Sequence, residues 1–358
     1  GEVDLSEDGA KIGGWSTMIE AVKIWTSGIG GDSELHIGYD SPPSPIKLGP
    51  RRALPLSLLG DQFPTCISIM EQQLLAPIAL ATDARFIVPL MSEQALCWLV
   101  GSEAKMAERL IKNGISAIAD IADTQVALGA LDRLISKGLV QLSCFTPTDA
   151  SHVLGSLDIY NKKAAILGAQ LFARQKDNKG KLIAKSKEAL SLICLDKLSF
   201  ESALKISEAV IAEDSGTENN ASSTHAIKEA LTKRSQQSRF LKHDVRLLSP
   251  IIALGASAKT YYPHIAECLN TSLVIPVFAE VAGAIGAAIG SIHQRSSITI
   301  TQPQEGIFRV HLTNGIKDFQ TLDDAIERAK QEAKTLSEKK AAKAGAIQYN
   351  TFLFENIQ

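Results

Sequence analysis

The stretch "GIGGDS" holds residue types that could take part in chemistry. Gly28, Gly30 and Gly31 directly precede Asp32 and Ser33. Glycines let a backbone approach a ligand closely, and a carboxylate beside a hydroxyl can meet a phosphate-bound cation or polarise a water molecule. The stretch therefore predicts ligand-binding roles for Gly30, Gly31 and Ser33, and a catalytic and metal-binding role for Asp32. The alternative is a tight turn in which Asp32 caps its own backbone.

A second stretch, "TPTDASHVLG", places four polar side chains within about one helical turn. They are Thr146, Thr148, Asp149 and His152. The functional interpretation gives Asp149 a catalytic role at the substrate and makes His152 a metal ligand. The structural alternative is a helix N-cap, with Thr148 or Asp149 accepting hydrogen bonds from the first backbone N–H groups of the next helix.

A third stretch, "ALGASAKTYYPHIAECL", reads as a buried strand that passes directly into a helix. Small residues fill the junction, namely Gly255, Ala256, Ser257 and Ala258. Small side chains there leave backbone N–H groups and the helix dipole open to a ligand, and they leave room for a flat ring. These four residues are therefore predicted to lie against a bound ligand. A tight turn without any ligand is the alternative.

Composition and charge exclude several other classes of function. The chain has 358 residues with a net charge of −2, so no overall positive field favours nucleic acid. Its five cysteines are scattered without a CxxC pair, which predicts reduced thiols in a cytoplasmic protein. The apolar run 272–292 includes Glu280 and many small residues, so it predicts a strand and a buried helix rather than a membrane span.

Four segments are expected to organise an α/β chain around these stretches. Short helical patterns across 92–145, followed by a β-like stretch and a hairpin, predict a winged-helix-like insertion. Asp123 and Thr124 should cap its third helix and Gly138 should end that helix. This helix presents few cations, so contact with a partner protein is favoured over DNA binding. The expected segments are 1–91, 92–145, 146–246 and 247–358.

The remaining expectations come from hydrophobic periodicity and turn residues. Glycine and alanine recur every four residues from Ala282 to Gly290, which predicts a tightly packed helix. Strands are predicted near 17–26, 34–38, 247–256, 272–277, 297–302, 308–312 and 348–355. Helices are predicted near 61–75 (with Asp61 as a cap), 162–175, 184–194, 199–212, 259–269 and 321–343.

Five stretches in the same order resemble the hydantoinase/oxoprolinase family, specifically the C-terminal hydantoinase A portion of N-methylhydantoinase A-like proteins. They are "GGWSTMIEAVKIWTSGIGGDSEL", "LGPRRALPLSLLG", "FTPTDASHVLG", "IALGASAKTYYPHIAECLNTSLVIPVFAEVAGAIGAA" and "EGIFRVHLTNGIKDFQTLDDAIERA". The resemblance runs over nearly the whole chain. It departs at Gly283, where relatives often carry Asn or Ser, and the family's Asp-Gly-Gly-Thr phosphate-binding turns are absent from the sequence.

The resemblance implies an actin/hexokinase/Hsp70-like (ASKHA, RNase H-like) ATPase lobe. Family members use ATP and a divalent metal ion such as Mg²⁺ to open cyclic amides such as hydantoins or 5-oxoproline. Residues 255–258 would then lie on the adenosine side, while Gly28–Ser33 and Thr146–His152 would face the interlobe cleft. The missing phosphate-binding turns imply that the chain is a C-terminal fragment, inactive by itself, of a longer hydrolase.

Three functions stay open at this point. The first is the ATP-dependent hydrolase, acting on a small cyclic amide, with a hydantoinase B-like second subunit and homo-oligomers as expected partners. The second is a subunit of an ATP-dependent carboxylase, which shares the fold. The third is a non-catalytic scaffold that binds a partner through residues 92–143.

Overall fold

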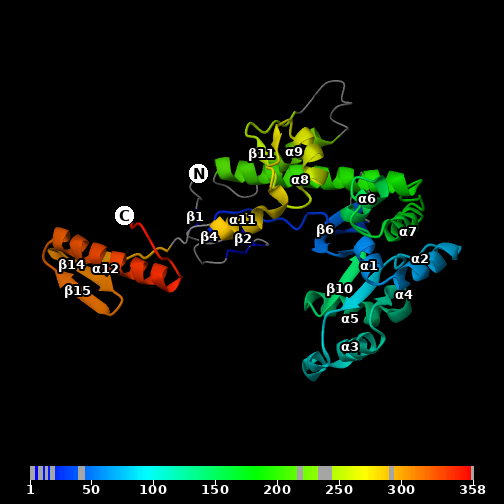
Figure 1. Cartoon of the computed structure of the whole chain (residues 1–358), viewed down its shortest axis with the longest axis horizontal. Coiled ribbons are helices and arrows are strands. Elements are labelled where there is room, and N and C mark those ends of the chain that lie inside the picture. Colours follow the sequence, from blue (N-terminus) through cyan, green and yellow to red (C-terminus); the bar gives the residue numbers. More distant parts are fainter. Residues whose placement is uncertain are drawn as a thin grey trace. The chain divides into compact units, whose positions relative to one another are not determined.

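The computed structural model describes residues 5–6, 11–12, 15–16, 21–38, 45–215, 221–232, 244–289 and 294–355. The chain divides into two compact units, residues 1–280 and 281–358, and each is described by itself. The described residues form a mixed α/β structure with several small sheets (Figure 1), which confirms the expected α/β class.

A four-stranded sheet in the first unit has the strand order β7-β10-β8-β9. Strand β10 pairs parallel with β7 and antiparallel with β8. The side chains of Ile87 and Leu142 are buried in one cluster with Leu110 and Leu134 from the neighbouring helices. The strands are β7 (Leu54–Pro55), β8 (Phe86–Pro89), β9 (Ser116–Ala117) and β10 (Val140–Cys144), and the helices are η1 (Glu93–Trp98), α3 (Gly101–Asn113), α4 (Ile118–Ile121) and α5 (Gln125–Ser136).

The larger core of the first unit joins a strand pair to a group of helices. Strands β5 (Ser33–Ile37) and β6 (Ile46–Arg52) are antiparallel, and Leu35 and Ile46 are buried between them and the helices. The long helix α8 crosses this group and contacts α6, α7 and α10 (Figure 1). The helices are α1 (Leu56–Gln62), α2 (Thr65–Leu75), α6 (Pro147–Leu154), α7 (Lys162–Ala173), α8 (Lys187–Ser215), α9 (Ala221–Leu231) and α10 (Ala258–Cys268).

Short strand pairs complete the first unit. Strands β11 (Ile251–Ile252) and β12 (Leu273–Val274) are parallel, and α10 connects them. Two further antiparallel pairs lie near the start of the chain. They are β1 (Leu5–Ser6) with β4 (Ala21–Val22), and β2 (Lys11–Ile12) with β3 (Trp15–Ser16).

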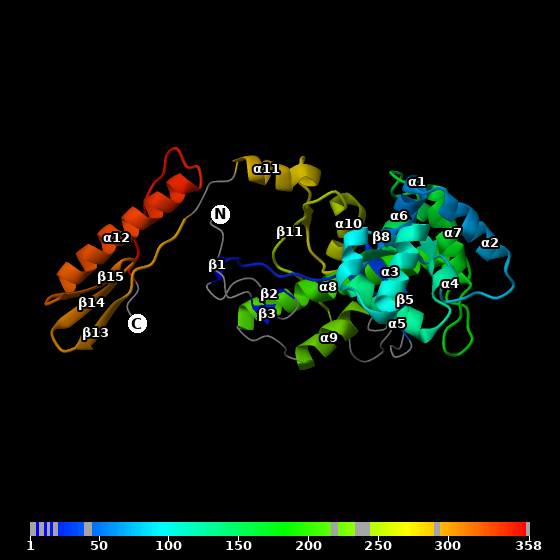
Figure 2. The ribbon, with the colours of Figure 1, turned by 90° about the horizontal axis from the view of Figure 1, so that it is seen from below.

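The second unit is a three-stranded antiparallel sheet with a long helix along it (Figure 2). Val310 is fully buried against Ala325 of that helix, so the two elements share a small core. Thr321 caps the helix by accepting a hydrogen bond from the Asp324 N–H group. The elements are η3 (Ala279–Val281, at the boundary), α11 (Ala282–Ile289), β13 (Ile300–Gln304), β14 (Ile307–Leu312), β15 (Gly315–Phe319) and α12 (Leu322–Lys343).

Several predicted elements agree with the structure. Helices α7, α10 and α12 lie where the periodicity placed them. The side chain of Thr124 caps α5, and Gly138 follows the C-cap residue Lys137 with a φ of 69°, as predicted for the end of that helix. Local capping and amphipathic patterns therefore predicted these helices well.

Other predicted elements were wrong. Helix α2 begins after Pro64, and Asp61 lies inside α1 instead of capping. The two helices expected at 184–194 and 199–212 are one helix, α8. No residue of α11 is buried, so the expected tight packing of its small residues is absent. Residues 348–355 form no strand, the strand near residue 251 is two residues long, and β10 pairs with strands before the helices instead of forming a hairpin after them.

Two further predicted elements lie only partly within the described residues. Residues 17–20 of the strand predicted near 17–26 lie outside them, as does Gly290 of the small-residue helix. None of the described helices combines the length and the apolar character needed to cross a bilayer.

Candidate functional site

Thr148 is the point at which the three chemically suggestive stretches meet. Its backbone N–H and its Oγ1 both donate to the carbonyl oxygen of Gly31, at 2.9 and 3.0 Å. The same Oγ1 lies 3.5 Å from Oδ1 of Asp32 and 3.5 Å from the hydroxyl oxygen of Tyr261. Tyr261 belongs to the first turn of α10, three residues after Ala258. The fold therefore brings the glycine loop, the start of α6 and the start of α10 together.

Gly30 and Gly31 differ in the space that surrounds their Cα atoms. A Cβ on Gly31 would lie 2.9 Å from Oγ1 of Thr148 and 3.0 Å from the hydroxyl oxygen of Tyr261. Gly30 has open space around it, and its N–H donates to Oγ of Ser33 at 2.9 Å. Ser33 in turn donates its N–H to the carbonyl oxygen of Gly30. Gly31 thus permits close packing, and Gly30 with Ser33 closes a turn; their ligand-binding roles stay predictions.

Asp32 remains accessible at this junction. Its carboxylate forms an ion pair with Arg52 at 2.9 Å, and 37% of its side chain is exposed. Its carbonyl oxygen accepts a hydrogen bond from the N–H of Ala53, which fixes the backbone beneath the carboxylate. A carboxylate that is held in place and still reaches solvent can take part in chemistry, so the catalytic and metal roles predicted for Asp32 stay predictions that this geometry permits.

Asp149 is fully buried and joins two helices. It accepts hydrogen bonds from the N–H groups of Leu56 and Ser57 at the start of α1, at 3.1 and 2.7 Å. It also accepts from the N–H and Oγ1 of Thr146, each at 3.0 Å, and completes a capping box at the start of α6. Burial raises the pKa of the Asp149 carboxyl, while the donors of Ser57, Leu56 and Thr146 oppose that shift.

These contacts decide between the two interpretations of the "TPTDASHVLG" stretch as far as capping is concerned. The N-cap residue is Thr146, so the alternative in which Thr148 or Asp149 is the N-cap was wrong. Asp149 supplies the reciprocal half of the capping box. Its catalytic role stays a prediction, and it would require the carboxylate to leave several backbone donors.

His152 is fully buried with both ring nitrogens engaged. Nδ1 lies 2.8 Å from the carbonyl oxygen of Thr148, and Nε2 accepts from the N–H groups of Ile159 and Tyr160 at 3.3 and 3.0 Å. The ring also stacks on Tyr160. Its role as a metal ligand stays a prediction, and metal binding would require these hydrogen bonds to break. Among the described residues, no group of three or more His, Cys, Asp or Glu side chains is arranged to hold a metal ion.

The small residues after β11 form an open corner. Gly255 has a φ of 105° and nothing near the position of a Cβ, and its N–H donates to the carbonyl oxygen of Ala279 at 2.7 Å. Ala256 and Ser257 are exposed, whereas Ala258 is buried under the first turn of α10. Among the described residues, no side chain fills the space at the Cβ position of Gly255, and the ligand-binding role of these four residues stays a prediction.

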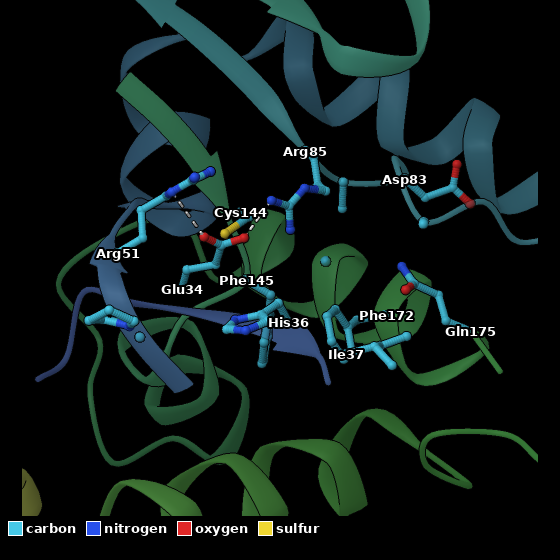
Figure 3. A pocket seen from close by; sticks show the side chains of 15 residues that line it. Glu34, His36, Ile37, Arg51, Asp83, Arg85, Cys144, Phe145, Phe172 and Gln175 are labelled. Atoms are coloured by element: carbon cyan, nitrogen blue, oxygen red, sulfur yellow. Dashed lines mark hydrogen bonds and ion pairs between the residues drawn. The ribbon is translucent and has the colours of Figure 1, made fainter. Parts of the chain in front are cut away.

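A cavity of about 670 Å³ is lined by Glu34, His36 and Ile37 of β5. Figure 3 shows Arg51 and Arg85 pointing toward Glu34, with Cys144 beside them. Arg85 donates from Nη2 to Oε1 of Glu34, and Nε of Arg51 lies 3.7 Å from Oε2 of the same carboxylate. Burial raises the pKa of the Cys144 thiol to about 12, so this thiol is not a nucleophile near neutral pH.

Sequence reasoning missed the polar residues of this cavity. Glu34 and His36 share a face of β5, and the two-residue alternation in "SELHIG" carries that signal. The facing strand β6 supplies Arg51, and the run "GPRR" marks that position. Arg85 precedes a strand distant in the sequence, and nothing in the local pattern predicts that it meets Glu34.

Comparison with known proteins gave no match, whether to a family model, to a curated protein or to a solved structure.

Proposed function

We propose that this chain is the C-terminal, ATP-binding portion of an ATP-dependent hydrolase of cyclic amides, with an ASKHA-like lobe. The supporting observation is the junction at Thr148, where the glycine loop, the start of α6 and the first turn of α10 are in contact. These are three of the stretches on which the resemblance to hydantoinases and oxoprolinases depends. A shared site would account for the contacts between these stretches, which are far apart in the sequence.

The chemistry assigns each part a task. An amide nitrogen is a poor leaving group, and transfer of a phosphoryl group from ATP to the amide oxygen activates the carbon toward water. In this proposal residues 255–258 hold the adenosine side, and Asp32 contacts the phosphate-bound divalent cation or the attacking water. Two water molecules are consumed: one adds to the activated carbon as the ring C–N bond breaks, and the second takes up the transferred phosphoryl group, so that the products are the ring-opened acid, ADP and phosphate. Oxygen ligands such as the Asp32 carboxylate suit Mg²⁺.

The test is ATP turnover by the intact protein with hydantoin, 5-oxoproline, or a ketone with bicarbonate. We expect ADP release that depends on a cyclic amide, and loss of at least about tenfold in the D32A variant, as expected for a catalytic electrostatic contact. Asp132 is the matched control because it is also an exposed carboxylate paired with an arginine, at 3.3 Å from Arg51. D132A should keep its turnover.

Two results would contradict the proposal. An ATP turnover rate that no cyclic amide increases would rule out the hydrolase function. An increase caused by the ketone with bicarbonate would favour the carboxylase function instead. Equal turnover in D32A and wild type would remove Asp32 from the reaction while leaving the function open to other residues.

A further inference from the structure

Arg85 lines the cavity of about 670 Å³ and has guanidinium N–H donors without an acceptor among the described residues. Arg85 donates to Glu34 only through Nη2, and in the described part of the chain its Nε and Nη1 have no protein acceptor. The side chain is only 20% exposed, so these N–H groups are held at the wall of the cavity and do not extend freely into water. A guanidinium has a rigid fork of donors that matches a carboxylate.

Charge at this wall is unbalanced in the positive direction. Arg51 and Arg85 face the single buried carboxylate of Glu34, which is 8% exposed. The second partner of Arg51 is Asp132, whose side chain is 62% exposed and therefore well screened by water. Two guanidinium groups thus meet one buried carboxylate at this wall, which favours a further anion there.

The other carboxylate that lines the cavity, Asp83, lies away from this pair. It accepts a hydrogen bond from the N–H of Leu80 at 2.9 Å, and Figure 3 shows it on the opposite side from Arg51 and Glu34. Burial raises the pKa of the Asp83 carboxyl, although the Leu80 N–H and Arg174 oppose the shift. Among the described residues, the ion pairs of Arg51 and Arg85 are with Glu34 and Asp132, and Asp83 is not a partner of either arginine.

A second unmet polar group borders the same cavity. Nδ1 of His36, a residue that lines the cavity, is buried and has no hydrogen-bond partner among the described residues. The remaining wall is largely apolar, with Ile37, Phe145 and Phe172 (Figure 3). A polar end beside an apolar end, within about 670 Å³, is the form of a small-molecule site.

We propose that this cavity binds a small organic monocarboxylate, with the carboxylate on Arg85 and an apolar ring or chain against Phe145 and Phe172. The inference does not depend on the hydrolase function, because it uses none of the residues around Thr148. The volume favours a free small molecule over a folded partner.

Calorimetric titration of the whole chain with benzoate, against its neutral analogue benzamide, tests this proposal. Benzoate should bind at least about tenfold more tightly than benzamide, because the charge-assisted contact is lost in the amide. R85Q should abolish the preference for benzoate. E34Q should strengthen benzoate binding several-fold, since it removes the carboxylate that competes for Arg85.

The variants also separate binding from folding. D132N changes only an exposed partner of Arg51 and should leave benzoate affinity within about twofold of wild type, as expected for a screened surface pair. If R85Q does not fold, the opposite sign expected for E34Q still decides the matter. Equal binding of benzoate and benzamide by the wild type, or weaker benzoate binding in E34Q, would overturn the proposal.

Discussion

At the scale of single residues, the glycine loop shows that one sequence signal can have two physical causes. Gly31 is required because Thr148 and Tyr261 pack against its Cα, whereas Gly30 borders open space. The sequence indicated that this loop approaches something closely. It could not indicate that the neighbours are protein side chains from α6 and α10, because they are more than a hundred residues away along the chain.

Gly31→Ala should destabilise the protein by about 1–3 kcal/mol, because the new methyl group overlaps Oγ1 of Thr148 and the hydroxyl of Tyr261. Gly30→Ala is the matched control, with nothing within 4 Å of its Cβ position, and it should change stability by less than about 1 kcal/mol. Urea denaturation monitored by circular dichroism measures both. Equal effects of the two substitutions would show that Gly31 is not closely packed.

At the scale of elements, caps and periodicity predicted the presence of helices better than their ends. Two helices were predicted at 184–194 and 199–212, yet α8 continues without a break to Ser215. Ser191 and Ser207 donate their hydroxyls to the carbonyl oxygens of Lys187 and Ala203, four residues earlier, so serines are satisfied inside the helix. A polar residue in a helical pattern is therefore not by itself a helix end.

Glu103 links α3 to the end of α5 and gives this contact a pH dependence. It accepts hydrogen bonds from Nζ of Lys137 and from Nε of Arg133, and these donors lower the pKa of the Glu103 carboxyl. A lowered pKa in the folded state adds stability above the ordinary glutamate pKa of 4.5. That stability is lost as the pH falls through the lowered value.

Accordingly, Glu103→Gln should be less stable than wild type at pH 7, and the difference should vanish at a pH below the lowered pKa. Glu108→Gln, on the exposed side of α3, is the control and should show little difference at either pH. Urea midpoints across a pH series measure this. A difference between Glu103→Gln and wild type that stays constant with pH would contradict the assignment.

At the scale of the whole molecule, the sequence predicted the α/β class and many helices, while long-range pairings required coordinates. Glu34 meets Arg85 from a different sheet, and β10 joins β7 to β8 across a long helical insertion. Local pattern records which face of a strand is buried, but not which distant strand lies beside it. The cavity residues were missed for this reason, whereas the residues around Thr148 were found because each lies in a distinctive local stretch.

The two compact units should unfold separately, because each has its own hydrophobic cluster. Val310→Ala in the second unit should cost about 2 kcal/mol by removing buried methyl groups. All three tryptophans, Trp15, Trp25 and Trp98, lie in the first unit, so fluorescence reports that unit. The substitution should shift the transition seen by circular dichroism and leave the fluorescence transition in place.

Ile316→Ala serves as the control for this experiment, since that side chain is 62% exposed on β15 and should cost little. A fluorescence transition that moves together with the circular dichroism transition in Val310→Ala would mean that the two units unfold as one.

The buried carboxylate of Asp149 has a consequence for the order of events during protein synthesis. The backbone N–H of Ser57 donates to the Asp149 carboxylate, which is synthesised 92 residues later. Until that codon is translated, the beginning of α1 has no permanent anchor, and the nascent chain exposes it to chaperones and proteases. The start of α1 therefore gains its native hydrogen bonds to the Asp149 carboxylate only after residue 149 has been synthesised.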